Sequence, residues 1–381
     1  IVPQLILALD IEDLRTSVEP DREAQILRLT GEEACRPFDL ANGPLIRGCL
    51  FRLDDMNHVL SLTLHHIVAD GWSMDVLRRE LASLYEAFKD GRPSPLPALP
   101  IQYVDLIAAQ RERPKGAADR RLLEYWANQL EGAPRLLNLP WDYPRPAIQG
   151  HRGARHPWTL EPELARRLYE VGARYRATPF MLLVSALGLL VSRYSRQTDF
   201  CIGTPVANRA GREAEQLVGC FVNTVVLRMD VSGNPSLPTL LDRVRTMVLR
   251  AQSHQELSFE RLVDELGVVR DLGHTPLFQV MFVLEDSPSD VRRFADLEAS
   301  RLNVGTGTSV FDLTLEMAQK TDGSLDAVFE YSTDLFAADT IARMAGHLQA
   351  LLRQIVASPE ASVSELSILS AGEQAVELAD S

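Results

Sequence analysis

Two stretches near the start of the chain alternate between apolar and polar positions. Residues 44–53 and 59–64 both show the period of two that is typical of a strand. The polar run 54–57 between them has the composition of a tight turn, so the three stretches predict a β-hairpin. The leucines of the second stretch share one face, and a continued pleat would place His66 on that inward face and His65 on the other.

A helical period follows the hairpin. Apolar residues recur at helical spacing from Val76 to Phe88, with Ser73 as the expected N-cap and Gly91 as the stop. Four prolines within 91–100 cannot continue a helix and predict a linker. The same reasoning predicts further helices near 102–110, 119–130, 180–194, 237–252 and 338–356, and strands near 1–9, 200–204, 222–229, 278–284 and 313–318.

The mixture of elements predicts an α+β protein with two lobes. A chain of 381 residues is long for one core. We expect a first lobe of residues 1–98, and a second lobe of residues 99–370 that includes connecting helices. The polar and acidic residues 371–381 are expected to form the start of a linker.

Composition and charge exclude several classes of function. Apolar residues make up 46% of the chain and charged residues 24%, as in soluble globular proteins. The net charge is −13 and there is no block rich in lysine and arginine, so no nucleic-acid partner is expected. The longest apolar run, 180–191, is shorter than the ~18 residues of a membrane span, so no membrane partner is expected.

The four cysteines lie far apart in the sequence. Cys35, Cys49, Cys201 and Cys220 form no CxxC pair and have no histidine at metal-ligand spacing. We therefore expect reduced thiols, a cytoplasmic protein and no metal site.

Reactive side chains crowd into residues 65–71. His66 is the side chain best suited to exchange a proton near neutral pH. Asp70 could orient an imidazole or fix the loop through an ionic contact, and Gly71 would allow a sharp turn and the close approach of a substrate. Free N–H groups at the start of the next helix could stabilise an oxyanion. A histidine beside a strand is more often a structural residue, so the residues alone leave that alternative open.

Other catalytic motifs do not occur. Residues 71–75 lack the second glycine of a GxSxG elbow, and the chain has no HExxH, no P-loop and no GxGxxG after a strand. The glycine-rich residues 305–308 lack a lysine and a strand–helix context, so they predict an ordinary loop.

The string at 65–73 resembles the HHxxxDG signature of the condensation domains of nonribosomal peptide synthetases. Its HxxxD core is also similar to that of the wider chloramphenicol-acetyltransferase-like acyltransferases. The resemblance covers essentially the whole chain. Further segments that resemble family motifs are 102–105, 203–209, 218–224, 254–260, 270–271 with 276–282, and 311–315.

The resemblance implies a fold and a reaction. The fold would be two chloramphenicol-acetyltransferase-like lobes in a V-shaped pseudo-dimer around a central tunnel. The reaction would be acyltransferase-type condensation within a biosynthetic assembly line for natural products such as antibiotics. The amine of a downstream carrier-bound aminoacyl thioester would attack an upstream carrier-bound peptidyl or aminoacyl thioester.

The resemblance also implies partners. The expected partners are upstream and downstream peptidyl carrier domains and an adjacent adenylation domain, because residues 369–374 resemble the linker into one. No cofactor is expected to be bound by the domain itself, since the phosphopantetheine arms belong to the carriers.

Residue roles follow from the same resemblance. His66 is expected to orient the amine and to take a proton from the tetrahedral intermediate, with the Gly71 N–H as oxyanion donor. His65 and Asp70 are expected to be structural. Candidates for contacting substrate in the tunnel are Trp72, Ser73, Asn208, Asn223 and Ser309.

The chain departs from the family pattern in several places. Two N-terminal motifs of the family do not occur in the sequence, so we expect the first lobe to lack its first elements. The motif aspartate of the family pairs with an arginine from that part, so Asp70 is expected to lack its usual partner. Ala109 stands where tryptophan is common, Glu256 and Ser258 replace aspartate and proline, and Gly273 replaces serine.

The motif residues also narrow the subtype of condensation domain that the chain resembles. Residues 72–74 do not read Ser-Trp-Arg as in epimerisation domains, and the histidine pair is not the Asp-x4-Asp of heterocyclisation domains. Residues 72–73 and 222–228 resemble domains that join two L-residues.

One alternative function is that of a non-catalytic recruitment module of the same fold, although such modules tend to lose the histidine that is intact here as His66. The other is an acyltransferase with a free small-molecule acceptor, which would differ only at the acceptor mouth.

Overall fold

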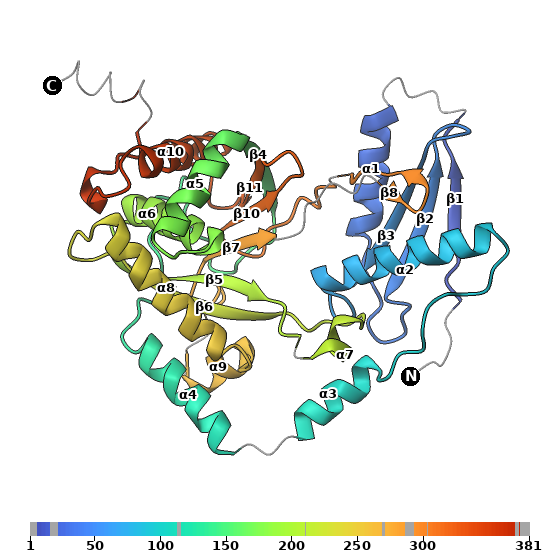
Figure 1. Cartoon of the computed structure of the whole chain (residues 1–381), viewed down its shortest axis with the longest axis horizontal. Helices are drawn as coiled ribbons and strands as arrows, with labels where there is room; N and C mark the ends of the chain where they lie inside the picture. Colours follow the sequence, from blue (N-terminus) through green and yellow to red (C-terminus); the bar gives the residue numbers. More distant parts are fainter. Residues whose placement is uncertain are drawn as a thin grey trace. The chain divides into compact units, whose positions relative to one another are not determined.

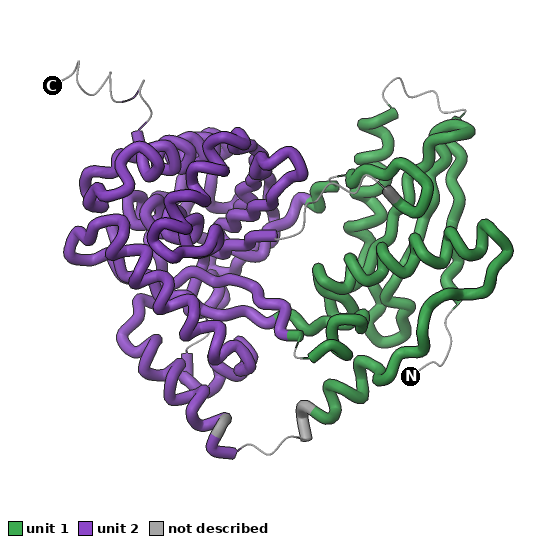
Figure 2. Tube along the Cα trace, in the orientation of Figure 1, with its two compact units in different colours: residues 1–113, 209–222, 291–306 green, residues 114–208, 223–290, 307–381 purple. Residues whose placement is uncertain are grey.

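The computed structural model shows an α+β chain that divides into two compact units (Figure 2). Unit 1 comprises residues 1–113, 209–222 and 291–306, and unit 2 comprises residues 114–208, 223–290 and 307–381. The residues that the structure describes are 6–15, 22–112, 116–209, 211–268, 271–285, 293–302, 304–369 and 373.

These units divide the chain differently from the predicted lobes of residues 1–98 and 99–370. Unit 1 also includes α3 (Tyr103–Glu112) and two segments from far downstream, 209–222 and 291–306. Local composition marks the proline linker, but it carries no information about which distant segments return to a unit. The predicted linker at 371–381 lies outside the described residues except for Glu373.

Unit 1 is built on a three-stranded sheet in the order β1-β2-β3. Strand β2 (Ile46–Arg52) pairs in parallel with β1 (Leu9–Asp13) and antiparallel with β3 (His58–Leu64). The predicted hairpin is therefore confirmed. The remaining elements of unit 1 are α1 (Arg22–Cys35), α2 (Gly71–Lys89), α7 (Arg212–Glu215), β8 (Arg293–Phe294) and β9 (Leu297–Glu298) (Figure 1).

The expected inward direction of His66 is wrong. The buried face of the hairpin carries Phe51 and Val59, which pack with Ile26 of α1, while Leu60 on the opposite face is 44% exposed. Strand β3 ends at Leu64, so the pleat does not continue into the histidine pair, and His66 is exposed in a turn. The sequence pattern marked the alternation correctly but could not tell which face α1 covers.

Unit 2 contains a six-stranded sheet in the order β4-β11-β10-β7-β5-β6. Strand β7 lies parallel to both β10 and β5, and the other neighbouring pairs are antiparallel. The strands are β4 (Gly153–Leu160), β5 (Asp199–Val206), β6 (Asn223–Asp230), β7 (Val280–Glu285), β10 (Leu313–Gln319) and β11 (Leu325–Ser332).

A layer of helices covers this sheet (Figure 1). Helix α6 (Pro179–Ser195) is almost entirely buried and packs against its helical neighbours α5, α8 and α10. The helix predicted near 180–194 is confirmed, and the Thr178 side chain caps it by accepting the Met181 N–H. The other helices of unit 2 are α4 (Ala117–Leu130), α5 (Pro162–Arg174), α8 (Leu237–Ser253), α9 (Phe259–Glu265) and α10 (Ala338–Ala357).

In the described part of the chain no single helix is both long enough and apolar enough to cross a membrane. Helices α5 and α6 reach that length and hydropathy only as a pair, which is bent by 101°. Helix α6 is the central core helix of unit 2.

Candidate functional site

The HHxxxDG residues form the connection between β3 and α2, within unit 1. The His65 N–H donates to the Leu45 carbonyl at 3.0 Å, which closes the end of the hairpin. The Val68 N–H then donates to the His65 carbonyl at 3.1 Å, and α2 begins at Gly71. The motif therefore turns tightly from a strand end to a helix start.

Asp70 caps the helix that follows the motif. Its backbone is extended, and its carboxylate accepts the Ser73 N–H at 2.9 Å. The prediction of Ser73 as the N-cap is wrong. The N-cap is Asp70, whose carboxylate accepts a free N–H of the first helical turn, and Ser73 lies inside the helix.

Asp70 has an arginine partner. The Nη2 of Arg209 lies 2.7 Å from Asp70 Oδ1, and the two side chains are only 2% and 3% exposed. The Nη1 of Arg209 donates to the carbonyls of Ala214 and Leu217, which fixes the guanidinium within segment 209–222. Asp70 was expected to lack its usual partner, an arginine from the N-terminal part of the family, and in this structure an arginine 139 residues downstream pairs with it instead.

The same carboxylate and its helix neighbour hold a second part of that segment. Asp70 Oδ2 accepts the Phe221 N–H at 3.0 Å, and Ser73 Oγ accepts the Gly219 N–H at 3.0 Å. Burial would raise the pKa of Asp70, but hydrogen bonds from Ser73, Phe221 and Arg209 outweigh it and lower the pKa below its usual value. We call Asp70, Ser73, Arg209, Gly219 and Phe221 the Asp70 anchor.

The two adjacent histidines have different surroundings. The Nδ1 of His65 accepts the Ile67 N–H at 3.1 Å, and its ring meets the edge of Phe38. The exposed His66 has its Nδ1 3.7 Å from the sulfur of Cys220. Within the described residues, the Nε2 of His66 makes no hydrogen bond. Within the described residues the Nε2 of His65 makes no hydrogen bond either, so His66 differs in being exposed, whereas His65 is half-buried.

Gly71 leaves space and free donors at the start of α2. Its φ angle is not left-handed, so the turn at this position does not use the conformational freedom of glycine. A Cβ at this position would meet no atom within 4 Å. Among the described residues, the N–H groups of Gly71 and Trp72 find no acceptor, as expected for the first helical turn. These two N–H groups are therefore hydrogen-bond donors without an acceptor in the described part of the chain, and an oxyanion role for Gly71 stays a prediction.

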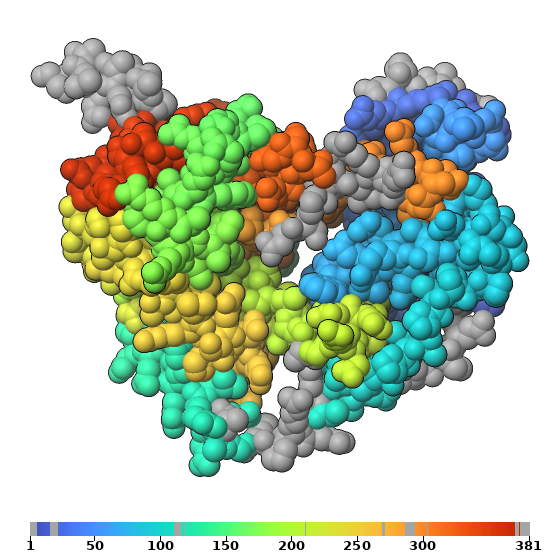
Figure 3. All heavy atoms as spheres, in the orientation of Figure 1, coloured from blue at the N-terminus to red at the C-terminus, as the bar shows by residue number. Residues whose placement is uncertain are grey.

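Two of the remaining candidate residues, Ser73 and Trp72, lie in the first turn of α2. Ser73 is fully buried within the Asp70 anchor, so this geometry gives its predicted substrate contact no support. Trp72 is 43% exposed, and its indole N–H donates to the Glu215 carbonyl of α7 at 2.9 Å. Figure 3 shows the α7 segment lying against the start of α2.

Two of the three tunnel candidates of unit 2 have structural contacts of their own. Buried Asn223 donates to the carbonyls of Gln255 and Leu257, and buried Ser309 donates to the Phe311 carbonyl. Asn208 is half-buried and has a φ of 50°. Their role in a substrate tunnel stays a prediction.

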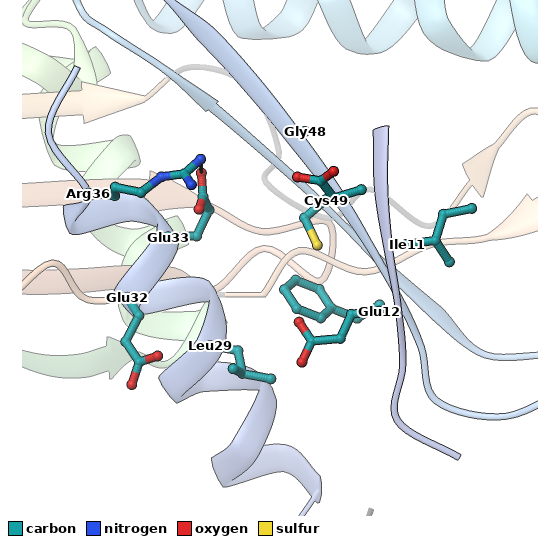
Figure 4. A pocket seen from close by; sticks show the side chains of 10 residues that line it. Ile11, Glu12, Leu29, Glu32, Glu33, Arg36, Gly48 and Cys49 are labelled. Atoms are coloured by element: carbon teal, nitrogen blue, oxygen red, sulfur yellow. Dashed lines mark hydrogen bonds and ion pairs between the residues drawn. The ribbon is translucent and has the colours of Figure 1, made fainter. Parts of the chain in front are cut away.

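A hollow of about 490 Å³ lies elsewhere in unit 1, between α1 and the strands β1 and β2 (Figure 4). Its wall includes the carboxylates of Asp10, Glu12, Glu32 and Glu33, and Arg36 pairs with Glu33 at 3.0 Å. Burial, together with Glu12 and neighbouring carboxylates, raises the pKa of the Cys49 thiol. No residue of the HHxxxDG motif lines this hollow, and the described residues hold no cluster of metal ligands.

Two functional neighbours of the motif were missed by the sequence reasoning. Arg209 ends the motif-like segment 203–209, and Cys220 lies inside the motif-like segment 218–224. Both segments resemble family motifs, and this resemblance is the signal in the sequence that could have pointed to the two residues. Which of their side chains reach the histidine loop depends on the path of the chain.

Sequence comparisons agree with the motif. A family model described as Condensation domain matches residues 3–376. The chain is 44% identical over 370 residues to a part of the linear gramicidin synthase of Brevibacillus parabrevis, covering 97% of this chain and 5% of that protein. It is 43% identical over 372 residues to chondramide synthase of Chondromyces crocatus, covering 98% and 10%. The chain thus spans a small part of the length of these relatives.

Solved structures show the same fold. A four-domain nonribosomal peptide synthetase bound to AMP and glycine matches with a TM-score of 0.83 at 26% identity, over 97% of this chain and 29% of that one. The X-domain from teicoplanin biosynthesis matches with a TM-score of 0.82 at 29% identity, over 95% and 81%.

Proposed function

Because the chain belongs to the condensation domains of nonribosomal peptide synthetases, a family that forms amide bonds by acyl transfer, we propose that it joins two carrier-bound substrates. The donor is an aminoacyl or peptidyl thioester on an upstream carrier domain. The acceptor is the amine of an aminoacyl thioester on a downstream carrier. The observation that carries this function is the intact HHxxxDG loop, in which the Nε2 of the exposed His66 and the N–H groups of Gly71 and Trp72 make no hydrogen bond among the described residues.

The reaction forms one bond and breaks one bond. The acceptor nitrogen attacks the donor thioester carbonyl, the C–N bond forms, and the C–S bond breaks. The proton of the amine ends on the released phosphopantetheine thiol. An α-amine has a pKa of roughly 7.7–8.0, so a useful fraction is neutral already, and its proton becomes acidic only after C–N bond formation.

His66 acts at that second stage. Its Nε2 aligns the amine and takes the proton from the tetrahedral intermediate, as a histidine can near neutral pH. Alignment of two tethered reactants contributes up to ~7–11 kcal/mol in favourable cases. The Gly71 N–H donates to the oxyanion, and the open space at its Cα permits the approach of the thioester.

The proposed partners are supported by the multidomain character of the relatives. Upstream and downstream peptidyl carrier domains deliver the substrates, and an adenylation domain follows in the assembly line. Phosphopantetheine arrives on the carriers, so the domain needs no resident cofactor. The proposed compartment is the cytoplasm, and the proposed substrates are two L-configured residues.

The test is single-turnover peptide formation with loaded upstream and downstream carriers, followed by intact mass. Wild type is expected to yield dipeptidyl carrier, and folded His66→Ala is expected to yield none. His58→Ala is the matched control, since His58 is an exposed histidine of the same hairpin. Equal product from wild type and His66→Ala would remove His66 from the mechanism.

The same assay separates the alternatives. If the wild type binds both carriers but forms no product, the chain is a recruitment module. If a free small amine replaces the downstream carrier without loss of rate, the chain is an acyltransferase with a free acceptor.

A further inference from the structure

The thiol of Cys220 lies against the proposed catalytic histidine. Its Sγ is 3.7 Å from the Nδ1 of His66, although 154 residues separate them in the sequence. Cys220 is half-buried, and both residues belong to unit 1. Nothing in the reaction described above uses this thiol.

The backbone around Cys220 is held on both sides. The Gly219 N–H donates to Ser73 Oγ at 3.0 Å, and the Phe221 N–H donates to Asp70 Oδ2 at 3.0 Å. The Cys220 carbonyl itself accepts the Tyr103 hydroxyl at 2.9 Å. The sulfur therefore projects from a segment that buried hydrogen bonds fix in place.

The Asp70 carboxylate is not available to His66. It is occupied by Ser73, Phe221 and Arg209, and His66 is not among its partners. Of the two roles that the motif suggested for Asp70, the structure favours fixing the loop. Within the described residues, the sulfur of Cys220 is the only hydrogen-bond partner of the His66 ring.

A neutral imidazole carries one N–H, so one ring nitrogen is a hydrogen-bond donor and the other is an acceptor. If Nε2 is to accept a proton from the amine, Nδ1 must carry the N–H. An Nδ1–H beside a sulfur has an acceptor, although a weak one. The 3.7 Å contact thus fits a ring held with Nδ1–H toward the sulfur and Nε2 toward the reactants.

We propose that Cys220 is a positioning residue for His66, a role that rests on the function proposed above. Its sulfur accepts the Nδ1–H of His66 and holds the ring in the tautomer whose Nε2 is free to take the proton. Cys220 touches neither substrate and forms no covalent intermediate.

Kinetics of two variants test this role. Cys220→Ala removes the acceptor, so kcat is expected to fall roughly tenfold with KM little changed, as for a loss of alignment. Cys220→Asp supplies a charged acceptor, which favours protonated imidazole. Relative to Cys220→Ala, this variant is expected to recover much of the kcat measured at alkaline pH. The fall of kcat on the acidic side of its pH profile is expected to occur at higher pH than in the wild type. Cys35→Ala is the control, since Cys35 is an exposed thiol of unit 1.

Unchanged kcat and an unchanged pH profile in both Cys220 variants would overturn the role, as would a loss confined to KM. A measurement on the wild type covers the case in which a variant does not fold. Nitrogen-15 chemical shifts of His66, assigned with a His66→Gln sample, are expected to show the proton on Nδ1. A proton found on Nε2 in the neutral ring would also refute the proposal.

The two proposals fail separately. If the wild type forms no peptide but His66 carries its proton on Nδ1, the proposed function is wrong and the proposed contact between Cys220 and His66 is retained. Wild type that forms peptide no faster than Cys220→Ala would remove only the role of Cys220.

Discussion

The two units are stabilised in different ways. In unit 2 one continuous apolar cluster joins the six-stranded sheet to α5, α6, α8 and α10. In unit 1 the apolar clusters are small, one around Leu14, Ile26 and Phe51 and one around Leu217 and Phe221. The candidate site belongs to unit 1, where the buried ion pair and hydrogen bonds of the Asp70 anchor hold the loop. A reactive loop can thus be fixed by polar contacts, which are directional, while the larger unit relies on apolar packing.

The largest effect is expected when the ion pair of the Asp70 anchor is broken. Arg209→Ala leaves the carboxylate of Asp70 buried without its cation, so the free energy of unfolding of unit 1 should fall by about 3–5 kcal/mol. Denaturant unfolding and amide exchange at residues 65–71 measure this loss, and peptide formation should be lost with it.

The control for that prediction is an exposed ion pair in unit 2. Arg174 and Glu360 lie 2.9 Å apart with both side chains more than half exposed, so Arg174→Ala should cost only about 0–1 kcal/mol. An equal cost for both arginine variants would show that the Asp70 anchor does not hold unit 1.

A somewhat smaller effect is expected from a cavity in the apolar core. Leu190 is fully buried in α6, so Leu190→Ala should destabilise unit 2 by about 2–5 kcal/mol. Amide exchange followed by mass spectrometry should show faster exchange in α6 and α8. Exchange at residues 65–71 should stay unchanged, because their hydrogen bonds lie within unit 1. Faster exchange there, with unit 2 still folded, would contradict the separate origin of the two stabilities.

The smallest effect is expected from pH. The folded-state pKa of Asp70 lies below its unfolded value of about 3.9, so ionisation of Asp70 stabilises the fold fully above that pH. This stabilisation is lost as the pH falls through the folded-state pKa. The difference in unfolding free energy between wild type and Asp70→Asn should therefore be constant from about pH 5 to 7 and shrink below about pH 4. A difference that grows on acidification would mean that the pKa of Asp70 is raised instead.

Several elements were predictable because their signals are local. The hairpin of β2 and β3, the core helix α6 and the long helix α10 all follow from apolar periodicity, and the structure has each of them. Two further elements have local signals although the predicted elements do not include them. Helix α5 has a proline at its first position, and β11 alternates between buried and half-buried residues.

Strand β4 was hidden for a physical reason. The predicted strands do not include it, and it contains Pro157, which is unfavourable within a central strand. The strand lies at the edge of the six-stranded sheet, where one side of the backbone needs no ladder partner. Edge position is a property of the sheet and not of the strand, so the sequence did not reveal it.

The sequence by itself determined the reactive motif, the family resemblance and most of the regular elements, because these depend on residues close together in the chain. The tertiary structure decided which side chains meet around the motif. Arg209 reaches Asp70 and Cys220 reaches His66 only because segment 209–222 returns to unit 1. Periodicity reports which face of an element is apolar, but a polar contact between residues far apart in the sequence depends on the path of the backbone. The open nitrogen of His66 and the anchored carboxylate of Asp70 are therefore results of the fold.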